Sequence, residues 1–218
     1  NPANPAAHEA TTGPEIWQQL DGRVDAVVAG VGSGGTITGL GRFFARVSPS
    51  TEMVLADPKG SILADYVNTG HLGEAGSWLV EGIGEDFVPP VSDLGLVRRA
   101  YTISDGESFG TARIVLRKEG ILVGSSSGTL IAAALRYCRE QTSAKNVVTF
   151  VCDSGNKYLS KMYNDFWMED QGLLSRDNFG DLCDLIARRH EEGAVVAANP
   201  EDSLAAAYQR MKLYDVSQ

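Results

Sequence analysis

The strongest constraint on the fold is a pattern that occurs twice along the chain: a short apolar strand, a loop rich in glycine or serine, and a helical repeat. The first copy runs from a β-branched run at 25–30 through Gly32–Thr36 into a helix that ends near Val47, and a strand follows at 52–58. The second copy has a strand at 121–123, a loop at Gly124–Gly128, a helix at 129–140 and a strand at 146–151. Alternation of this kind predicts an α/β fold with a mostly parallel sheet covered by helices.

Charge and hydropathy exclude several classes of partner. The 218 residues carry 19 Lys and Arg against 28 Asp and Glu, a net charge of −9, which opposes binding to nucleic acid or to an anionic membrane. The chain has no apolar run long enough for a bilayer and no signal sequence at its beginning, so we expect a cytoplasmic protein. The three cysteines and three histidines lack metal-ligand spacing, and we expect no metal site.

The first glycine loop is a candidate anion site. Gly32, Ser33, Gly34 and Gly35 let backbone N–H groups converge at the beginning of a helix, and Thr36 adds a hydroxyl donor. The loop matches neither the dinucleotide pattern Gly-x-Gly-x-x-Gly nor a nucleoside-triphosphate loop ending in Gly-Lys-Ser/Thr. The alternative is a tight turn that serves only the packing of helix on sheet.

Two further polar loops are predicted to lie at the same edge of the sheet. Ser125, Ser126 and Ser127 either cap the following helix or present a hydroxyl to a ligand, because ligands of open α/β folds bind at the carboxyl ends of the strands. Asp153, Ser154 and Asn156 follow the next strand, and capping is the favoured role there. These patterns indicate a small molecule that carries a phosphate, and no more.

The chain divides by composition into residues 1–174 and 175–218. The first part ends with a helix predicted through Tyr163 and Trp167 to Gly172. The tail is predicted to contain a linker, a helix with Leu182, Leu185 and Ile186, a strand at 194–198 and a helix from Asp202. Because the chain begins with Asn1 and stops within a helical pattern, we expect a piece of a longer protein.

These segments resemble, in the same order, the second half of the catalytic region of the cystathionine β-synthase family, which are pyridoxal 5'-phosphate (PLP) enzymes of fold type II. The resemblance covers Asn1 to about Leu173. The motifs that carry it are NPANPAAHEATTGPEIW, VGSGGTITG, ADPKGSILA, VEGIGEDFVP, GSSSG and CDSGNKYLSKMYNDFWM. The tail, from about Phe179, is similar to the beginning of a CBS-domain regulatory module that stops before the unit can close.

The resemblance implies roles for individual residues. The cofactor would be bound by Gly32, Ser33, Gly34, Gly35 and Thr36 at its phosphate and by Ser126 at its pyridine nitrogen. Gly82, Ile83, Gly84 and Glu85 would line the substrate entrance, with Glu85 where animal members carry Tyr. The Schiff-base lysine of the family is expected before Asn1, so the resemblance implies no catalytic residue in this chain and no activity of this chain by itself.

A neutral hydroxyl at the ring nitrogen limits electron withdrawal by the cofactor and suits β-elimination and β-replacement. The resemblance thus implies that the complete protein condenses L-serine with L-homocysteine to cystathionine. Alternatives are cysteine synthase chemistry with O-acetylserine and sulfide, or a non-catalytic ligand-binding half with a nucleotide-sensing tail. The implied partners are small amino-acid substrates, the amino-terminal half of the same protein and further copies in a homodimer or higher homo-oligomer.

Overall fold

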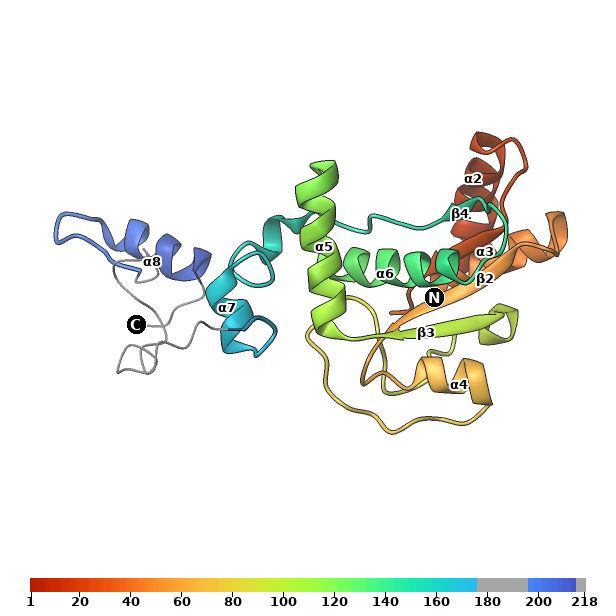
Figure 1. Cartoon of the computed structure of the whole chain (residues 1–218), viewed down its shortest axis with the longest axis horizontal. Coiled ribbons are helices and arrows are strands. Elements are labelled where there is room, and N and C mark those ends of the chain that lie inside the picture. Colours follow the sequence, from red (N-terminus) through yellow and green to blue (C-terminus); the bar gives the residue numbers. More distant parts are fainter. Residues whose placement is uncertain (176–195, 215–218) are drawn as a thin grey trace. The chain divides into compact units, whose positions relative to one another are not determined.

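A computed structural model describes residues 1–175 and 196–214 of the chain (Figure 1). The chain separates into two compact units, Asn1–Ser154 and Gly155–Gln218. The catalytic region implied by the resemblance extends to residue 174, and that boundary stays a prediction.

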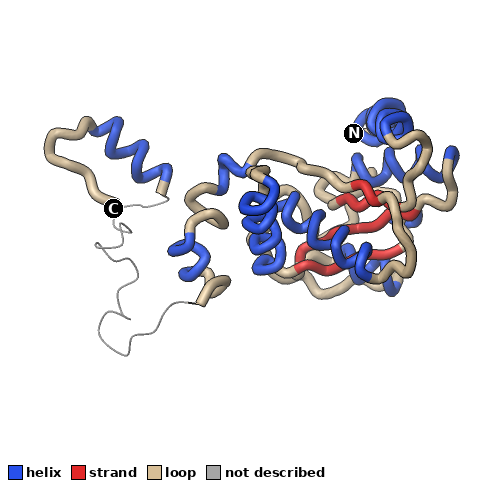
Figure 2. The backbone as a smooth tube through the Cα atoms, turned by 45° about the horizontal axis from the view of Figure 1, so that its top comes forward, coloured by secondary structure: helices blue, strands red, loops and turns tan. Residues whose placement is uncertain are grey.

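The first unit is built on a four-stranded, wholly parallel sheet, shown as red strands in Figure 2. Its strands are β1 (Ala26–Ala29), β2 (Glu52–Pro58), β3 (Arg99–Ile103) and β4 (Val147–Val148), in the spatial order β3-β2-β1-β4. The predicted α/β class with a parallel sheet is therefore confirmed. The predicted strand at 121–123 is wrong, because only Val123 makes an isolated bridge, to Ser154.

Helix α3 (Gly35–Val47) covers the face of the sheet to which Val27 and Leu55 point. The helices α1 (Ala3–Ala7) and α2 (Gly13–Gln19) and the π-helical turn η1 (His8–Thr12) pack against α3. Ile37, Leu40 and Phe44 of α3 join the two strand residues in one buried cluster. Burial of these apolar side chains is the main favourable term that holds α3 on the sheet.

The opposite face is covered by α6 (Ser125–Arg139), which contacts β1, β2 and β3, and α5 (Asp105–Glu119) packs against α6 (Figure 1). The cap of α5 is Ser104, whose hydroxyl accepts a hydrogen bond from the Glu107 N–H. The three serines predicted in a loop instead form the first turn of α6. Two short helices, α4 (Leu63–Thr69) and the 3₁₀ turn η2 (Leu94–Leu96), complete the unit.

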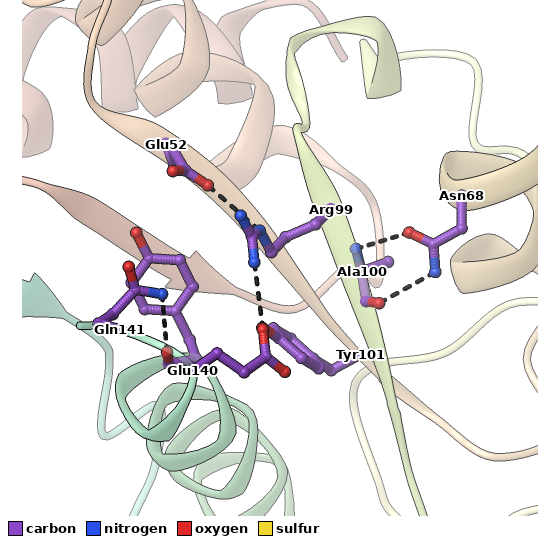
Figure 3. Close-up of polar contacts among 8 residues, drawn as sticks. Glu52, Asn68, Arg99, Ala100, Tyr101, Glu140 and Gln141 are labelled. Carbon is purple, nitrogen blue, oxygen red and sulfur yellow. Dashed lines mark hydrogen bonds and ion pairs between the residues drawn. The ribbon is translucent and has the colours of Figure 1, made fainter.

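A side chain covers part of the outer edge of β3. The Asn68 amide donates to the Ala100 carbonyl and accepts from the Ala100 N–H, both at 3.0 Å (Figure 3). Toward α6, Arg99 pairs with Glu52 and Glu140, each at 3.2 Å. Asn68 thus occupies backbone groups that an unprotected edge would offer to another strand.

The second unit contains the 3₁₀ turn η3 (Gly155–Tyr158), α7 (Asp165–Asp170) and α8 (Leu204–Leu213). The helix predicted through Tyr163 is shorter, since Asn164 caps the beginning of α7. The predicted helix with Leu182, Leu185 and Ile186 lies outside the described residues, as do the first two residues of the predicted strand at 194–198. Residues 196–198 form no strand, and α8 begins at Leu204, capped by Ser203, instead of at Asp202. None of the helices in the described ranges is long and apolar enough to span a membrane.

Candidate active site

The turn between β1 and α3 presents free backbone donors. The first helical bond runs from the Thr38 N–H to the Gly34 carbonyl, so the N–H groups of Gly35, Thr36 and Ile37 have no partner within the helix. No side chain caps α3, and its first turn holds no acidic residue. Gly34 has a φ of 84°, and a β-carbon there would collide with Ser92. Neutral donors at the positive end of a helix fit a phosphate dianion.

The amino-terminal helices form a wall of this turn. Asn4 Nδ2 donates to Ser33 Oγ at 3.1 Å, and His8 Nε2 lies 3.2 Å from Thr36 Oγ1. His8 Nδ1 in turn lies 3.0 Å from Thr12 Oγ1. None of these three residues was predicted to lie at the site, although the separations of four between Asn4, His8 and Thr12 indicate one helical face.

The loop Gly82–Glu85, which the resemblance assigns to the substrate entrance and which is called the entrance loop below, lies directly against the β1–α3 turn. The Gly84 N–H donates to the Val31 carbonyl at 2.8 Å. A β-carbon on Gly32 would lie 2.7 Å from the Gly82 carbonyl oxygen, so only glycine allows this approach. The structure therefore brings together the two predicted loops, 32–36 and 82–85.

The serines in the first turn of α6 join the same assembly. Ser125 Oγ accepts from the Glu81 N–H at 3.0 Å, next to the entrance loop, and Ser127 Oγ accepts from the Cys152 N–H at 2.9 Å. Ser126, between them, is only 5% exposed, and its hydroxyl interacts with the Cys152 thiol. Burial raises the pKa of that thiol. The first and third hydroxyls thus bind backbone, while the middle one is the member that the resemblance assigns to the cofactor.

Of the third predicted loop, Asp153 and Ser154 belong to the first unit. The Gly124 N–H donates to the Asp153 carbonyl at 2.9 Å, which fixes the beginning of α6 against this loop. Asp153 and Ser154 thus neighbour the serine turn through their backbone. Asn156 belongs to the second unit.

Two carboxyl groups near the entrance loop, those of Asp57 and Glu85, have raised pKa values. Asp57, at the end of β2, is fully buried, and burial raises its pKa to about 6 against the opposing effect of the Ala64 N–H and the Ser61 hydroxyl. Its Oδ2 accepts from Ala64 at 2.8 Å, whereas Oδ1 is buried with no hydrogen-bond partner among the described residues. Partial burial, with the neighbouring Asp86, also raises the pKa of Glu85.

The lysines of the first unit are placed away from these turns or on the surface. Lys145 pairs with Asp25 at 3.2 Å, at the amino ends of the strands, and Lys118 lies in the last turn of α5. Lys59 is exposed after β2. Within 1–175 and 196–214, no three His, Cys, Asp or Glu side chains gather as a metal site.

Known proteins share these segments. The chain is 41% identical over 174 residues to the cystathionine beta-synthase of Apis mellifera, covering 80% of this chain and 34% of that protein, and 40% identical over 177 residues to that of Oryctolagus cuniculus, covering 81% and 32%. It is equally similar, 40% over 175 residues, to cysteine synthase A of Escherichia coli (strain K12), covering 78% and 54%. The chain thus spans about a third to a half of these relatives. Residues 1–153 match the family described as pyridoxal-phosphate dependent enzyme. This chain, with its phosphate-type turn and parallel sheet, belongs to the family of pyridoxal-phosphate dependent enzymes.

Proposed function

We propose that the complete protein catalyses a β-replacement in which L-serine and L-homocysteine condense to cystathionine and water. The observation that carries this proposal is the meeting of three turns: the free donors of α3, the entrance loop and the buried hydroxyl of Ser126. When bound, PLP withdraws electrons from the substrate so that the β-substituent can leave.

The residues of this chain would bind and orient the cofactor. The N–H groups of Gly35 and Thr36 and the Thr36 hydroxyl would hold the phosphate, with His8 orienting that hydroxyl from behind. Ser126 would donate its proton to a hydrogen bond with the pyridine nitrogen and leave that nitrogen unprotonated. The Schiff-base lysine would come from the part of the protein before Asn1.

Cysteine synthase chemistry is the second candidate, since the cysteine synthase A relative is as similar as the cystathionine beta-synthases. The Glu81–Gly84 segment with Asp86-Phe87, and the run Asn164–Met168, favour the serine and homocysteine reaction by their resemblance. The full-length protein should be assayed with both substrate pairs. A larger kcat/KM for serine with homocysteine is expected, and a larger value for O-acetylserine with sulfide would reverse the assignment.

A non-catalytic ligand-binding protein with a nucleotide-sensing tail is the third candidate. It would bind PLP and show no turnover with either pair. We also propose, with the β-replacement function, a CBS-type regulatory tail, a homo-oligomeric assembly and a cytoplasmic location. An effector titration tests the first, sedimentation the second and cell fractionation the third.

A further inference from the structure

Ser61, which lies between β2 and α4, is hydrogen bonded to the backbone of Glu85 in both directions. Its Oγ accepts from the Glu85 N–H at 3.0 Å and donates to the Glu85 carbonyl at 3.1 Å. The Ile62 N–H donates to the same carbonyl at 3.1 Å. The Ser61 side chain is nearly buried, at 8% exposed, so these bonds are shielded from water.

Different groups hold the part of the chain that leads into the entrance loop. Asp105 Oδ1 accepts from the N–H groups of Leu79 and Val80, at 3.0 and 3.2 Å, and Ser125 accepts from Glu81. Trp78 Nε1 donates to the Ile83 carbonyl at 3.1 Å. Hydrogen bonds thus hold the chain on both sides of the loop. Ser61 provides the side-chain hydrogen bonds at its carboxyl-terminal end, at Glu85.

The loop contains two glycines in the left-handed region of backbone conformation. Gly82 and Gly84 have φ angles of 86° and 89°, and glycine loses more backbone freedom on folding than any other residue. A segment with two such glycines keeps one conformation only when surrounding contacts fix it. Loss of the Ser61 bonds would therefore loosen the loop at Glu85, while the Gly84 N–H keeps its bond to the Val31 carbonyl beside the β1–α3 turn.

From this geometry we propose that Ser61 is a positioning residue, whose hydroxyl holds the Gly82–Glu85 loop in the place where it receives the amino-acid substrate. The proposal rests on the proposed function for the identity of the substrate, but the fastening itself is independent of it. In this role Ser61 acts through the backbone of Glu85. Its hydroxyl also lies against the Asp57 carboxyl and accepts from the Leu63 N–H at 3.4 Å. It follows that substrate binding should depend on Ser61 more than turnover does.

The test compares Ser61→Ala with Thr51→Val in the full-length protein. Thr51 is a matched control because it is equally buried, at 6% exposed, and its hydroxyl likewise bridges two segments, donating to the Val24 carbonyl at 2.7 Å, at the amino ends of the strands. Each variant loses one buried hydroxyl. Ser61→Thr keeps the hydroxyl and should retain the wild-type behaviour.

Hydrogen exchange is the first readout and needs no activity. In Ser61→Ala, exchange of the amides at 82–86 should accelerate about tenfold, as loss of a buried hydrogen bond allows, while Thr51→Val leaves this peptide unchanged. The second readout is kinetic: KM for the amino-acid substrate should rise about tenfold in Ser61→Ala, with kcat within about twofold.

The outcomes separate this proposal from the proposed function. If the wild-type protein turns over neither substrate pair, the proposed function fails, and the exchange data still decide the role of Ser61. If the wild type is active but Ser61→Ala shows the exchange and KM of Thr51→Val, Ser61 has no positioning role. Equal acceleration of exchange at the 82–86 amides in both variants would also overturn the positioning role of Ser61. The faster exchange would then reflect a general loss of stability.

Discussion

Three adjacent serines at the beginning of α6 have three different environments. Ser125 is bound to the chain before the entrance loop, Ser127 to the chain after β4, and Ser126 lies between them beside the Cys152 thiol. Rigid neighbours on both sides hold the middle hydroxyl in a defined position. This arrangement is what an interaction with one atom of a cofactor requires.

The first prediction concerns the charge at this position. In the full-length protein, Ser126→Asp should lower β-replacement by at least about tenfold, about 1.4 kcal/mol, and more than Ser126→Ala does. A carboxylate would favour a protonated pyridine nitrogen and change the electron withdrawal for which the site is suited. Steady-state turnover and the PLP absorbance spectrum measure the effect. Equal rates for wild type and Ser126→Asp would remove Ser126 from this role.

Asp57 leads to a prediction about pH. Its pKa of about 6 in the folded protein exceeds the ordinary 3.8, so between these values the folded state keeps a proton that the unfolded state has released. Stability therefore falls as pH rises through this window. Asp57→Asn keeps an acceptor for the Ala64 N–H but cannot ionise.

Relative to Asp57→Asn, the free energy of unfolding of the wild type should fall by on the order of 3 kcal/mol between about pH 4 and about pH 7. Denaturant titrations at several pH values measure this difference. Asp21→Asn, at an exposed carboxylate, is the control. A difference between wild type and Asp57→Asn that does not change with pH would show that Asp57 keeps its ordinary pKa.

At the scale of elements, the sequence predicted the strands and helices that are continuous apolar runs or have apolar residues at helical spacing. The strands at 26–29 and 52–58 are β-branched or apolar runs, and α3 has apolar residues at helical spacing. β3 was missed because Arg99–Ile103 is polar and only partly buried, so it lacks the signal of an interior strand. α6 begins earlier than predicted because serines, typical of loops and caps, are buried here by contacts from distant segments.

The edge of β3 leads to the third prediction. Asn68→Ala should lower the free energy of unfolding by about 1 kcal/mol, because two backbone groups of Ala100 lose their side-chain partners. It should also increase aggregation at high concentration, since an uncovered edge can pair with another strand. Chemical denaturation and light scattering measure these effects. Glu74→Ala, in the exposed loop that follows α4, should change neither, and an Asn68→Ala protein that matches it would contradict the proposed protection.

At the scale of the whole molecule, we propose that the chain supplies the phosphate and ring-nitrogen contacts and that it lacks the Schiff-base lysine. The fourth prediction is that residues 1–218, purified alone, bind PLP weakly and catalyse no β-replacement. Mixing with the amino-terminal half should restore activity, because the two halves would share the contacts of one domain. Measured turnover by this chain alone, or PLP fixed by borohydride to any of its six lysines, would contradict the expected position of the lysine.

The sequence by itself determined the strands β1 and β2, the helix α3 and the glycine turn between β1 and α3. These properties depend on residues within one turn or one strand, where side-chain periodicity and backbone freedom decide the conformation. Only the tertiary structure decided the strand order, the contact of His8 with Thr36 and the fastening of the entrance loop by Ser61 and Ser125. Those bonds join residues that are 24 to 44 positions apart, so they depend on how the helices pack on the sheet and leave no periodic signal in the sequence.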